Sequence, residues 1–282
     1  MEVKHLVASG YLLIASIELA LYWLNIAHQK RGACPLPPEL AVEVDAGSIQ
    51  RALQYGTAKS WLASWHKASF TCLFCWFLFG PWLAKYDAWI GTLGQSFVLR
   101  GTLFYLGLLL AKTIFDIPFD LYRTFSIEEH FQFNATSGNL WLSDMIKSTL
   151  LSLFFTGLLS ASALWLVQNS PGMWWLWIWI LLVLSSLLIT IISPRLLEPL
   201  FFKLTRITRT ELETKIRRMA KRTGVRPTGI WQIDASRRSS HANAYFTGFG
   251  RQKRIVLFDT LLGQLDDDEI VAVLAHEIGH WR

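Results

Sequence analysis

The stretch "PGMWWLWIWILLVLSSLLITIIS", Pro171 to Ser193, contains no charged residue and decides the class of fold. A helix needs about 20 predominantly apolar residues to cross the hydrocarbon core of a bilayer, and this stretch is long enough. The composition agrees, because 52 % of the 282 residues are hydrophobic and only 17 % are charged. Such a balance is typical of a membrane protein. The tryptophans at its start are the residues expected to anchor a helix at the membrane interface.

Four other segments are long and apolar enough to cross a membrane as helices: Leu6–Ala27, Ala68–Ala84, Ser96–Phe115 and Ser148–Val167. Only Gln168 to Ser170 separate the last of these from the quoted stretch, so the two should form a tight transmembrane hairpin. The first is longer than the apolar part of a signal peptide and lacks a cleavage site, so we expect it to be retained. The sequence therefore predicts a mainly α fold, a polytopic bundle of about five membrane helices.

Lysine and arginine are densest directly after the quoted stretch, between Arg195 and Arg222. Since loops rich in these residues stay in the cytoplasm, this side of the bundle should be cytoplasmic. The same placement accounts for the net charge of +6 without a nucleic-acid partner, because a basic surface helix can meet anionic lipid. Three cysteines are too few for a disulfide framework, and Cys72 and Cys75 lie in an apolar run where they should only pack.

The character of the chain changes after the basic run begins, so we predict a membrane domain 1–204 and a second domain 205–282. Thr210 and Glu213 have the spacing of a capping box, and the helix that they open should end before Gly224. Three strands are indicated by β-branched and aromatic residues: "TGIWQID", "NAYFTGFG" and "KRIVLFD". The second domain therefore contains a small β-element.

A last helix is predicted from Asp266, which is a plausible N-cap with Glu269 three residues further on. This helix carries an H-E-x-x-H motif, formed by His276, Glu277 and His280. Residues four apart lie on one face of an α-helix, so both imidazoles can bind one Zn²⁺ ion. Glu277 projects from nearly the same side and can accept a proton from water and pass it to the leaving amine. The motif predicts a zinc metallopeptidase.

A catalytic zinc usually takes three protein ligands, and the motif supplies two. The remaining acidic candidates have no spacing that selects one of them: Glu128, Glu129, Asp234, Asp259 and Asp266 to Asp268. The third ligand is therefore not assigned from the residues.

Two long stretches carry a resemblance to a known family. "SRRSSHANAYFTGFGRQKRIVLFDTLL" and "EIVAVLAHEIGHWR" closely resemble the type I CAAX prenyl proteases, which are integral-membrane zinc metallopeptidases of endoplasmic reticulum and bacterial membranes. "DLYRTFSIEEHFQFN", Asp120 to Asn134, is similar to the loop after the third transmembrane helix of that family. The resemblance covers the chain from about Leu103 onward.

The resemblance implies a membrane endopeptidase in which His276 and His280 bind Zn²⁺ and Glu277 is the catalytic acid and base. It implies removal of the last three residues of farnesylated proteins in eukaryotic members, while the substrate here stays open. It also implies a third ligand, a glutamate on a downstream helix, and two more membrane helices, which the 282 residues do not contain. We therefore expect a truncated, zincin-like domain whose chain alone binds zinc weakly; a split protein and a non-catalytic relative are the alternatives.

The segment Asn243 to Gly248 has two interpretations. Asn243, Ala244, Tyr245 and Phe246 could form an edge strand that pairs with an extended peptide substrate, or they could be a hairpin strand of the core. Glu18, in the middle of the first apolar segment, is expected to have a structural role facing the bundle interior. His66, His130 and His241 lack metal-ligand spacing, and only His241 lies close enough to the strand to be a candidate.

The predicted protein is an integral, multi-pass membrane zinc endopeptidase of the endoplasmic reticulum or a bacterial inner membrane. Its partners would be the bilayer and a peptide or protein substrate, possibly lipidated, and its oligomeric state is left open. Two other classes stay in view: a non-catalytic membrane scaffold or inactive fragment, and a zinc hydrolase that acts on something other than a peptide.

Overall fold

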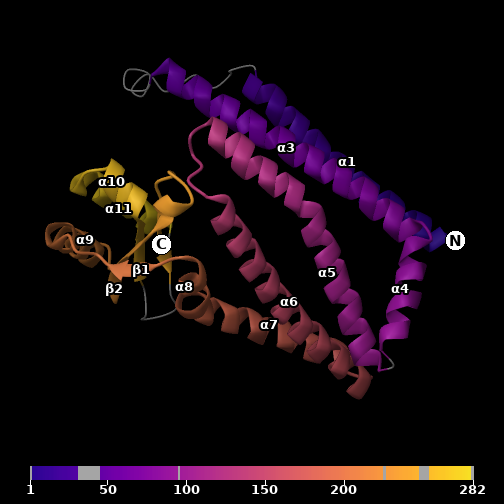
Figure 1. The fold of residues 1–282 in the computed structure, drawn as a ribbon. Coiled ribbons are helices and arrows are strands. Elements are labelled where there is room, and N and C mark those ends of the chain that lie inside the picture. The colour runs from indigo at the N-terminus through magenta and orange to yellow at the C-terminus, as the bar shows by residue number, and fades with distance from the viewer. Residues whose placement is uncertain (1, 31–44, 95, 225–226, 248–253, 281–282) are drawn as a thin grey trace. The chain divides into compact units, whose positions relative to one another are not determined.

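The computed structural model of the protein describes residues 2–30, 45–94, 96–224, 227–247 and 254–280 (Figure 1). The chain divides into two compact units. The first unit comprises Met1–Gln132 with Ser152–Trp165, and the second comprises Phe133–Leu151 with Leu166–Arg282. These units do not test the predicted domains 1–204 and 205–282, which stay a prediction.

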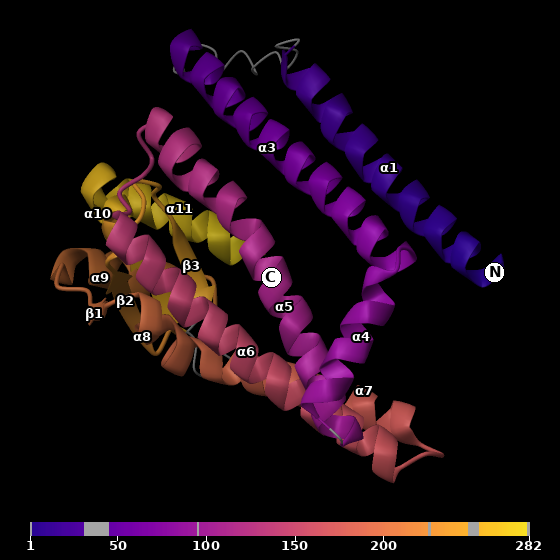
Figure 2. The same cartoon turned by 45° about the vertical axis from the view of Figure 1, so that its right-hand side comes forward.

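The first unit is built from long helices. Its elements are α1 (Glu2–Lys30), α3 (Ala46–Phe79), α4 (Trp82–Leu93), α5 (Phe97–Tyr122), the π-helix Arg123–Glu128 and the middle of α6 (Gly138–Asn169). Helices α1 and α3 lie side by side and antiparallel along most of α1 (Figures 1 and 2). Aromatic pairs mark their seam, with ring centroids 4.8 Å apart for Trp23 and Trp61 and 5.1 Å apart for Tyr11 and Phe74.

The predicted span Ala68–Ala84 is wrong as a single straight helix. Helix α3 ends at Phe79, and α4 leaves it at an angle of 68°. The reason is the Gly80-Pro81 pair, because proline has no N–H for a helical bond and its ring clashes with the preceding turn. Gly80 is needed at the bend, since a Cβ there would lie 2.3 Å from the carbonyl oxygen of Trp76.

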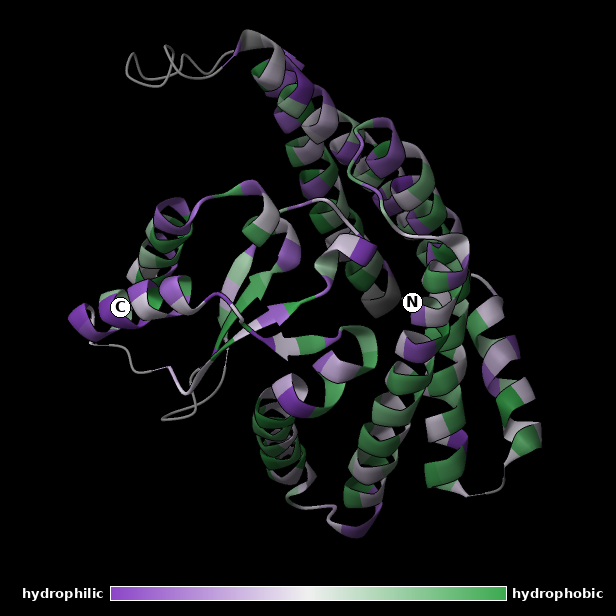
Figure 3. Ribbon diagram, turned by 60° about the vertical axis from the view of Figure 1, so that its left-hand side comes forward, coloured by the Kyte–Doolittle hydropathy of each residue, from purple (hydrophilic) through white to green (hydrophobic). Residues whose placement is uncertain are grey.

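Within the described residues, four helical spans are long and apolar enough to cross a membrane, and five if the bent pair is counted as one span. These are His5–Lys30, Phe97–Glu128, Gly138–Asn169, Trp174–Phe201 and the bent pair Gly47–Phe79 with Trp82–Leu93. The prediction of about five membrane helices is confirmed in this sense. Figure 3 shows hydrophobic residues along most of these long helices, whose side chains are largely exposed rather than packed inside the protein.

The second unit contains the remaining elements: α7 (Trp174–Ile192), the π-helix Ser193–Leu197, α8 (Glu198–Phe201), β1 (Leu204–Arg206), α9 (Thr210–Arg222), β2 (Gly229–Ile233), a 3₁₀ turn (Ala235–Arg237), β3 (Ala244–Thr247), β4 (Arg254–Phe258), α10 (Asp259–Gln264) and α11 (Asp267–His280). A tight turn between α6 and α7 was predicted, and the N–H of Met173 donates to the carbonyl of Ser170 at 3.2 Å. All three predicted strands are present, and β1 is an additional strand of three residues.

The four strands form one sheet in the order β1-β2-β4-β3. Strands β2 and β4 are parallel, while β1 and β3 pair antiparallel at the two ends. One face of the sheet is covered by α9 and α11, whose core side chains are fully buried against it: Leu212, Ile216, Ile270 and Leu274 with Ile230, Ile255 and Leu257. The opposite face holds a second cluster around Val256, which includes Phe202, Trp231 and Tyr245.

The two predicted helix caps have different outcomes. At α9 the N-cap is Arg209 without a side-chain cap, and Glu213 pairs with Arg217 at 2.7 Å, so the predicted box is wrong. At α11 the predicted box is confirmed, because Asp266 Oδ1 accepts from the N–H of Glu269 at 2.9 Å and Glu269 Oε2 accepts from the N–H of Asp266 at 2.8 Å. The reciprocal bonds satisfy donors that the start of a helix leaves without partners.

Candidate metal centre

Helix α11 is oriented by its buried face. Ile270, Leu274 and Ile278 recur one turn apart and are at most 1 % exposed, which fixes them against the sheet. His276 falls on the side of the helix turned away from this core and is exposed, while Glu277 lies on the flank and is half-buried. The packing of α11 therefore presents His276 outward and leaves Glu277 beside it.

The helix continues through His280, so the H-E-x-x-H motif is helical over its whole length as predicted. Residues His276 and His280 follow one another by about one turn on the same face of α11. The side chain of His280 lies outside the described part of the structure. Imidazole nitrogens are donors that zinc prefers, so the two histidines of the motif fit a zinc ion in kind and supply two protein ligands.

The described residues contain no group of three His, Cys, Asp or Glu side chains that could hold a metal ion. Several of the acidic candidates have structural roles instead. Asp259 accepts from the N–H of Ser236 at 2.8 Å, and Asp234 accepts from the N–H of Lys203 at 2.7 Å. Glu128 accepts from the hydroxyl of Tyr55 at 2.6 Å.

The acidic cap of α11 is also engaged. Asp266 caps the helix, Asp267 lies 3.5 Å from Arg209, and Asp268 lies 2.6 Å from Lys215. The bond to Asp268 raises the pKa of the Lys215 ammonium above its ordinary value. Asp267 and Asp268 therefore hold α11 to the start of α9, while Asp266 caps its own helix, and no metal-binding cluster is found among the described acidic residues.

Strand β3 lies at the end of the described sheet and beside α11. Phe246 packs against Ala220 and Ile278, so the strand touches the motif helix. The N–H of Phe258 donates to the carbonyl of Asn243 at 3.0 Å, which directs the backbone of Asn243 toward β4. Because successive residues of a strand point their backbone groups to opposite sides, those of Ala244 and Phe246 point away from β4. Ala244–Thr247 is the end strand of the described sheet and also pairs antiparallel with β4, so both interpretations of this segment stay predictions; Gly248 lies outside the described residues.

The loop that leads into β3 is held by the start of α6, a link that the sequence did not indicate. Arg238 donates to both carboxylate oxygens of Asp144, at 2.8 and 3.1 Å, and its guanidinium lies 4.6 Å from the ring centroid of Phe202. An isolated antiparallel bridge joins Asn134 to Ser239. An arginine directly before a predicted strand and an aspartate in an apolar helix were the available signals, but nothing in the sequence pairs them.

His241 belongs to this same loop rather than to a metal cluster. Its ring stacks on Phe133 with centroids 4.2 Å apart, and its carbonyl accepts from the hydroxyl of Thr260 at 2.8 Å. His241 lies close to β3, as expected, and its contacts with Phe133 and Thr260 hold the loop before the strand. Whether it takes part in the site stays a prediction.

A second link missed by the sequence joins β3 to the end of the last membrane helix. The hydroxyl of Tyr245 donates to Glu198 Oε1 at 3.0 Å, and Arg254 donates to the carbonyl of Pro194 at 3.5 Å. Burial and the nearby negative charge of Glu198 raise the pKa of the Tyr245 phenol well above its ordinary value. Tyr245 therefore faces away from α11, toward the segment that follows α7.

The isolated charged and histidine residues of the membrane helices also have partners. Glu18 forms an ion pair with Lys67 on α3, which agrees with its expected structural role. His66 Nε2 lies 2.8 Å from Asp116 on α5, and the His130 ring packs edge-on against Phe131. The contacts of Glu18 and His66 join helices of the first unit, whereas His130 contacts its neighbour in the chain.

Two models of known protein families match most of the chain. A model described as "CAAX prenyl protease N-terminal, five membrane helices" matches residues 25–203, and a model of peptidase family M48 matches residues 206–282. The CAAX prenyl protease 1 of Saccharomyces cerevisiae is 35 % identical over 98 % of this chain and 63 % of its own length. A homologue from Arabidopsis thaliana is 38 % identical over 72 % of this chain and 49 % of its own length.

The crystal structure of Ste24p from S. mikatae superposes on 99 % of this chain with a TM-score of 0.89 and 34 % sequence identity. The match covers 66 % of the Ste24p chain, so the present chain spans about half to two thirds of the length of these relatives. Fold, sequence and both family models agree. The chain belongs to the CAAX prenyl proteases of peptidase family M48, a family of integral-membrane metallopeptidases.

Proposed function

We propose that the protein acts as a membrane-embedded zinc endopeptidase and that its substrates are prenylated proteins or peptides. The observation that carries the proposal is the H-E-x-x-H motif on a capped helix that packs directly beside an edge strand. The names of the relatives supply the substrate class, because the yeast and Arabidopsis proteins are CAAX prenyl proteases. Since the chain spans only part of those proteins, its own activity is included in the proposal.

Each residue of the motif has a separate task. His276 and His280 would hold the zinc ion, which when bound supplies Lewis acidity at the scissile carbonyl. Glu277, on the flank of α11, would take a proton from the attacking water and deliver it to the nitrogen of the leaving amine. A carboxylate one residue from a metal ligand is well placed for this transfer, because both side chains leave the same turn of the helix.

Strand β3 would hold the peptide. The backbone groups of Ala244 and Phe246 point away from β4, which is the direction from which an added strand approaches a sheet edge. Asn243 Oδ1 accepts from the N–H of Ala244 at 2.8 Å, so the side chain already occupies the first position along this edge. An extended substrate would therefore pair with the carbonyl of Ala244 and with the backbone of Phe246, along the edge of the strand that lies beside α11.

The basic segment that follows α7 supports a cytoplasmic position for this catalytic helix, in either an endoplasmic reticulum or a bacterial inner membrane. The proposed division of labour is a membrane domain 1–204 and a metallopeptidase domain 205–282. The alternative is the non-catalytic membrane scaffold, and it differs from the enzyme in what it predicts for zinc content and turnover.

Zinc content and peptide hydrolysis, measured on the purified 282-residue chain, separate the two candidates. Glu277→Gln should keep the zinc stoichiometry of the wild type and abolish cleavage of a farnesylated peptide, whereas His276→Ala should lower both. Glu269→Gln is the matched control, because it changes a carboxylate of the same helix that serves only in the cap. A zinc-loaded wild-type chain without turnover would support the scaffold, and unchanged turnover in Glu277→Gln would refute the proposed mechanism.

A further inference from the structure

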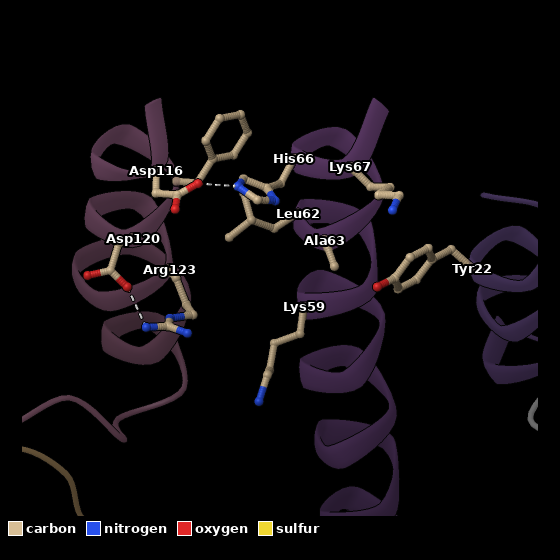
Figure 4. Close-up of a pocket in the computed structure, with 10 residues that line it drawn as sticks. Tyr22, Lys59, Leu62, Ala63, His66, Lys67, Asp116, Asp120 and Arg123 are labelled. Atoms are coloured by element: carbon tan, nitrogen blue, oxygen red, sulfur yellow. Dashed lines mark hydrogen bonds and ion pairs between the residues drawn. The ribbon is translucent and has the colours of Figure 1, made fainter. Parts of the chain in front are cut away.

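A polar pocket of about 420 Å³ lies among α1, α3 and α5 in the first unit (Figure 4). Its walls carry an unusual set of side chains for membrane helices: three cations, two carboxylates and a phenol. Ionisable groups inside a membrane protein are costly and usually have a function. The peptidase chemistry proposed above uses none of them.

The contacts of α3 with α5 and with the π-helix that follows α5 show which residues of these helices lie at the same height. His66 faces Asp116 across the antiparallel pair α3 and α5, and Tyr55 faces Glu128. Lys59 lies about two turns from His66, and Arg123 lies about two turns from Asp116 in the opposite chain direction. Lys59 and Arg123 are therefore at the same level, on facing helices at one end of the pocket (Figure 4).

That end of the pocket lies close to the end of α1. The hydroxyl of Thr57 donates to Gln29 Oε1 at 3.2 Å, and α1 ends at Lys30. Lys59 is less than one turn deeper than Thr57 along α3. The cationic end of the pocket therefore lies near the end of α1, a helix that is apolar and long enough to cross a membrane, and the rest of the pocket extends along the apolar part of that helix.

Among the described charges around the pocket, one cation, Lys59, has no direct carboxylate partner. Asp116 is bound by His66 and Lys112, Asp120 forms an ion pair with Arg123, and Lys67 forms one with Glu18. Lys59 contacts only the hydroxyl of Tyr55 at 3.3 Å and the ring of the same tyrosine, and it has no carboxylate partner in the part of the chain that the structure describes. The same hydroxyl donates to Glu128 at 2.6 Å, so that carboxylate reaches Lys59 only through the phenol. An anion between Lys59 and Arg123 would be the direct counter-ion that Lys59 lacks.

An apolar pocket of about 550 Å³ adjoins the polar one, because both are lined by Leu62 and Phe119. Its other walls are almost entirely apolar and aromatic, including Trp61, Trp65 and Tyr122. A polar space and an apolar space that share a wall fit a molecule with a charged head and a hydrocarbon chain. Basic pockets between membrane helices are the places where anionic lipid headgroups bind.

We propose that this pair of pockets is a binding site for one anionic phospholipid. The phosphodiester lies between Lys59 and Arg123, and an acyl chain follows the aromatic wall of Trp61 and Phe119. Lys59 supplies a positive charge that has no direct carboxylate partner. The planar guanidinium of Arg123 supplies hydrogen-bond donors in addition to those that bind Asp120. The site is independent of zinc and of peptide cleavage.

Native mass spectrometry of the whole 282-residue chain, reconstituted with equal amounts of phosphatidylglycerol and phosphatidylcholine, tests the proposal. The wild type should retain one phosphatidylglycerol in preference to phosphatidylcholine. Lys59→Gln should lower this retention about fivefold, which is the share of one lysine near a membrane surface. Lys59→Arg should restore it.

Lys85→Gln is the matched control, because Lys85 lies over the ring of Trp82 on α4, outside both pockets. Its retention of phosphatidylglycerol should equal that of the wild type, and circular dichroism should show the same helicity for all variants. Equal retention in wild type and Lys59→Gln, or no preference over phosphatidylcholine, would overturn the proposal. If the chain retains no lipid but binds inorganic phosphate at millimolar concentration through Lys59, the ligand is a free phosphate and the lipid assignment fails.

Discussion

Helices α7 and α11 contain similar apolar residues that lie in opposite environments. Leu184 in α7 is 59 % exposed, whereas Leu274 in α11 is fully buried. Helix α7 is apolar on all sides and meets lipid, so its leucines need no protein partner. Helix α11 has one apolar face that packs on the sheet and one polar face that carries His276. A leucine side chain therefore contacts lipid in α7 and packs in the protein core in α11.

The comparison predicts a large difference between two identical truncations. Leu274→Ala should destabilise the sheet region by about 3 kcal/mol, because it removes a fully buried side chain and leaves a cavity beneath the metal motif. Leu184→Ala should change stability by less than about 0.5 kcal/mol, since it loses only contact with lipid. Hydrogen exchange of the amides of β4 in the whole chain measures both effects. Equal losses would mean that α7 is packed as α11 is.

A second contrast concerns charge rather than apolar surface. Arg238 and Asp144 are 17 % and 21 % exposed and form a bidentate pair between the loop before β3 and α6. Arg238→Met removes both hydrogen bonds of the bidentate pair and leaves the half-buried Asp144 carboxylate with only Lys147, 4.0 Å away, so we expect a loss of about 2 kcal/mol. In the exposed pair of Lys215 and Asp268, the corresponding Lys215→Met should have a much smaller effect, because solvent screens this ion pair.

The double variant Asp144→Leu with Arg238→Met sharpens this test. Replacing both members of a buried pair by apolar residues is often neutral, so most of the lost stability should return. Exchange of the β3 amides reports on the loop that the pair holds. If Arg238→Met and Lys215→Met have equal effects, the pair does not fix the loop, and another contact such as the bridge of Asn134 to Ser239 must do so.

The parts of the fold that sequence reasoning predicted correctly are those set by local patterns. Long apolar runs predicted the membrane helices, β-branched and aromatic residues predicted three strands, and the spacing of Asp266 and Glu269 predicted the cap of α11. Each signal lies within one continuous stretch of the chain. The helical placement of His276 and Glu277 follows from the same period.

The parts that were missed depend on tertiary contacts or on very short signals. The bend after Phe79 was readable in Gly80-Pro81 but was hidden by the apolar run around it. Strand β1 has three residues, which is too short for a periodic pattern. The bonds of Arg238 to Asp144 and of Tyr245 to Glu198 join residues far apart in the chain. One sequence without relatives does not show which distant charges meet.

The smallest predicted effect concerns the membrane-side face of β3, in contrast to the face against α11. Phe246 packs toward α11 and has no titratable group, whereas Tyr245 donates to Glu198, and its raised pKa keeps the phenol neutral in the fold beyond its ordinary range. Since the folded pKa exceeds the unfolded value of about 10, the stabilisation is complete below that pH and is lost as the pH rises above it. The difference absorbance at 295 nm between wild type and Tyr245→Phe isolates this tyrosine. Glu198→Gln should shift its titration to lower pH by removing the negative charge, although burial of the ring still holds it above an exposed tyrosine. If that variant leaves the titration unchanged, burial alone raises the pKa, and β3 is not linked electrostatically to the end of the last membrane helix.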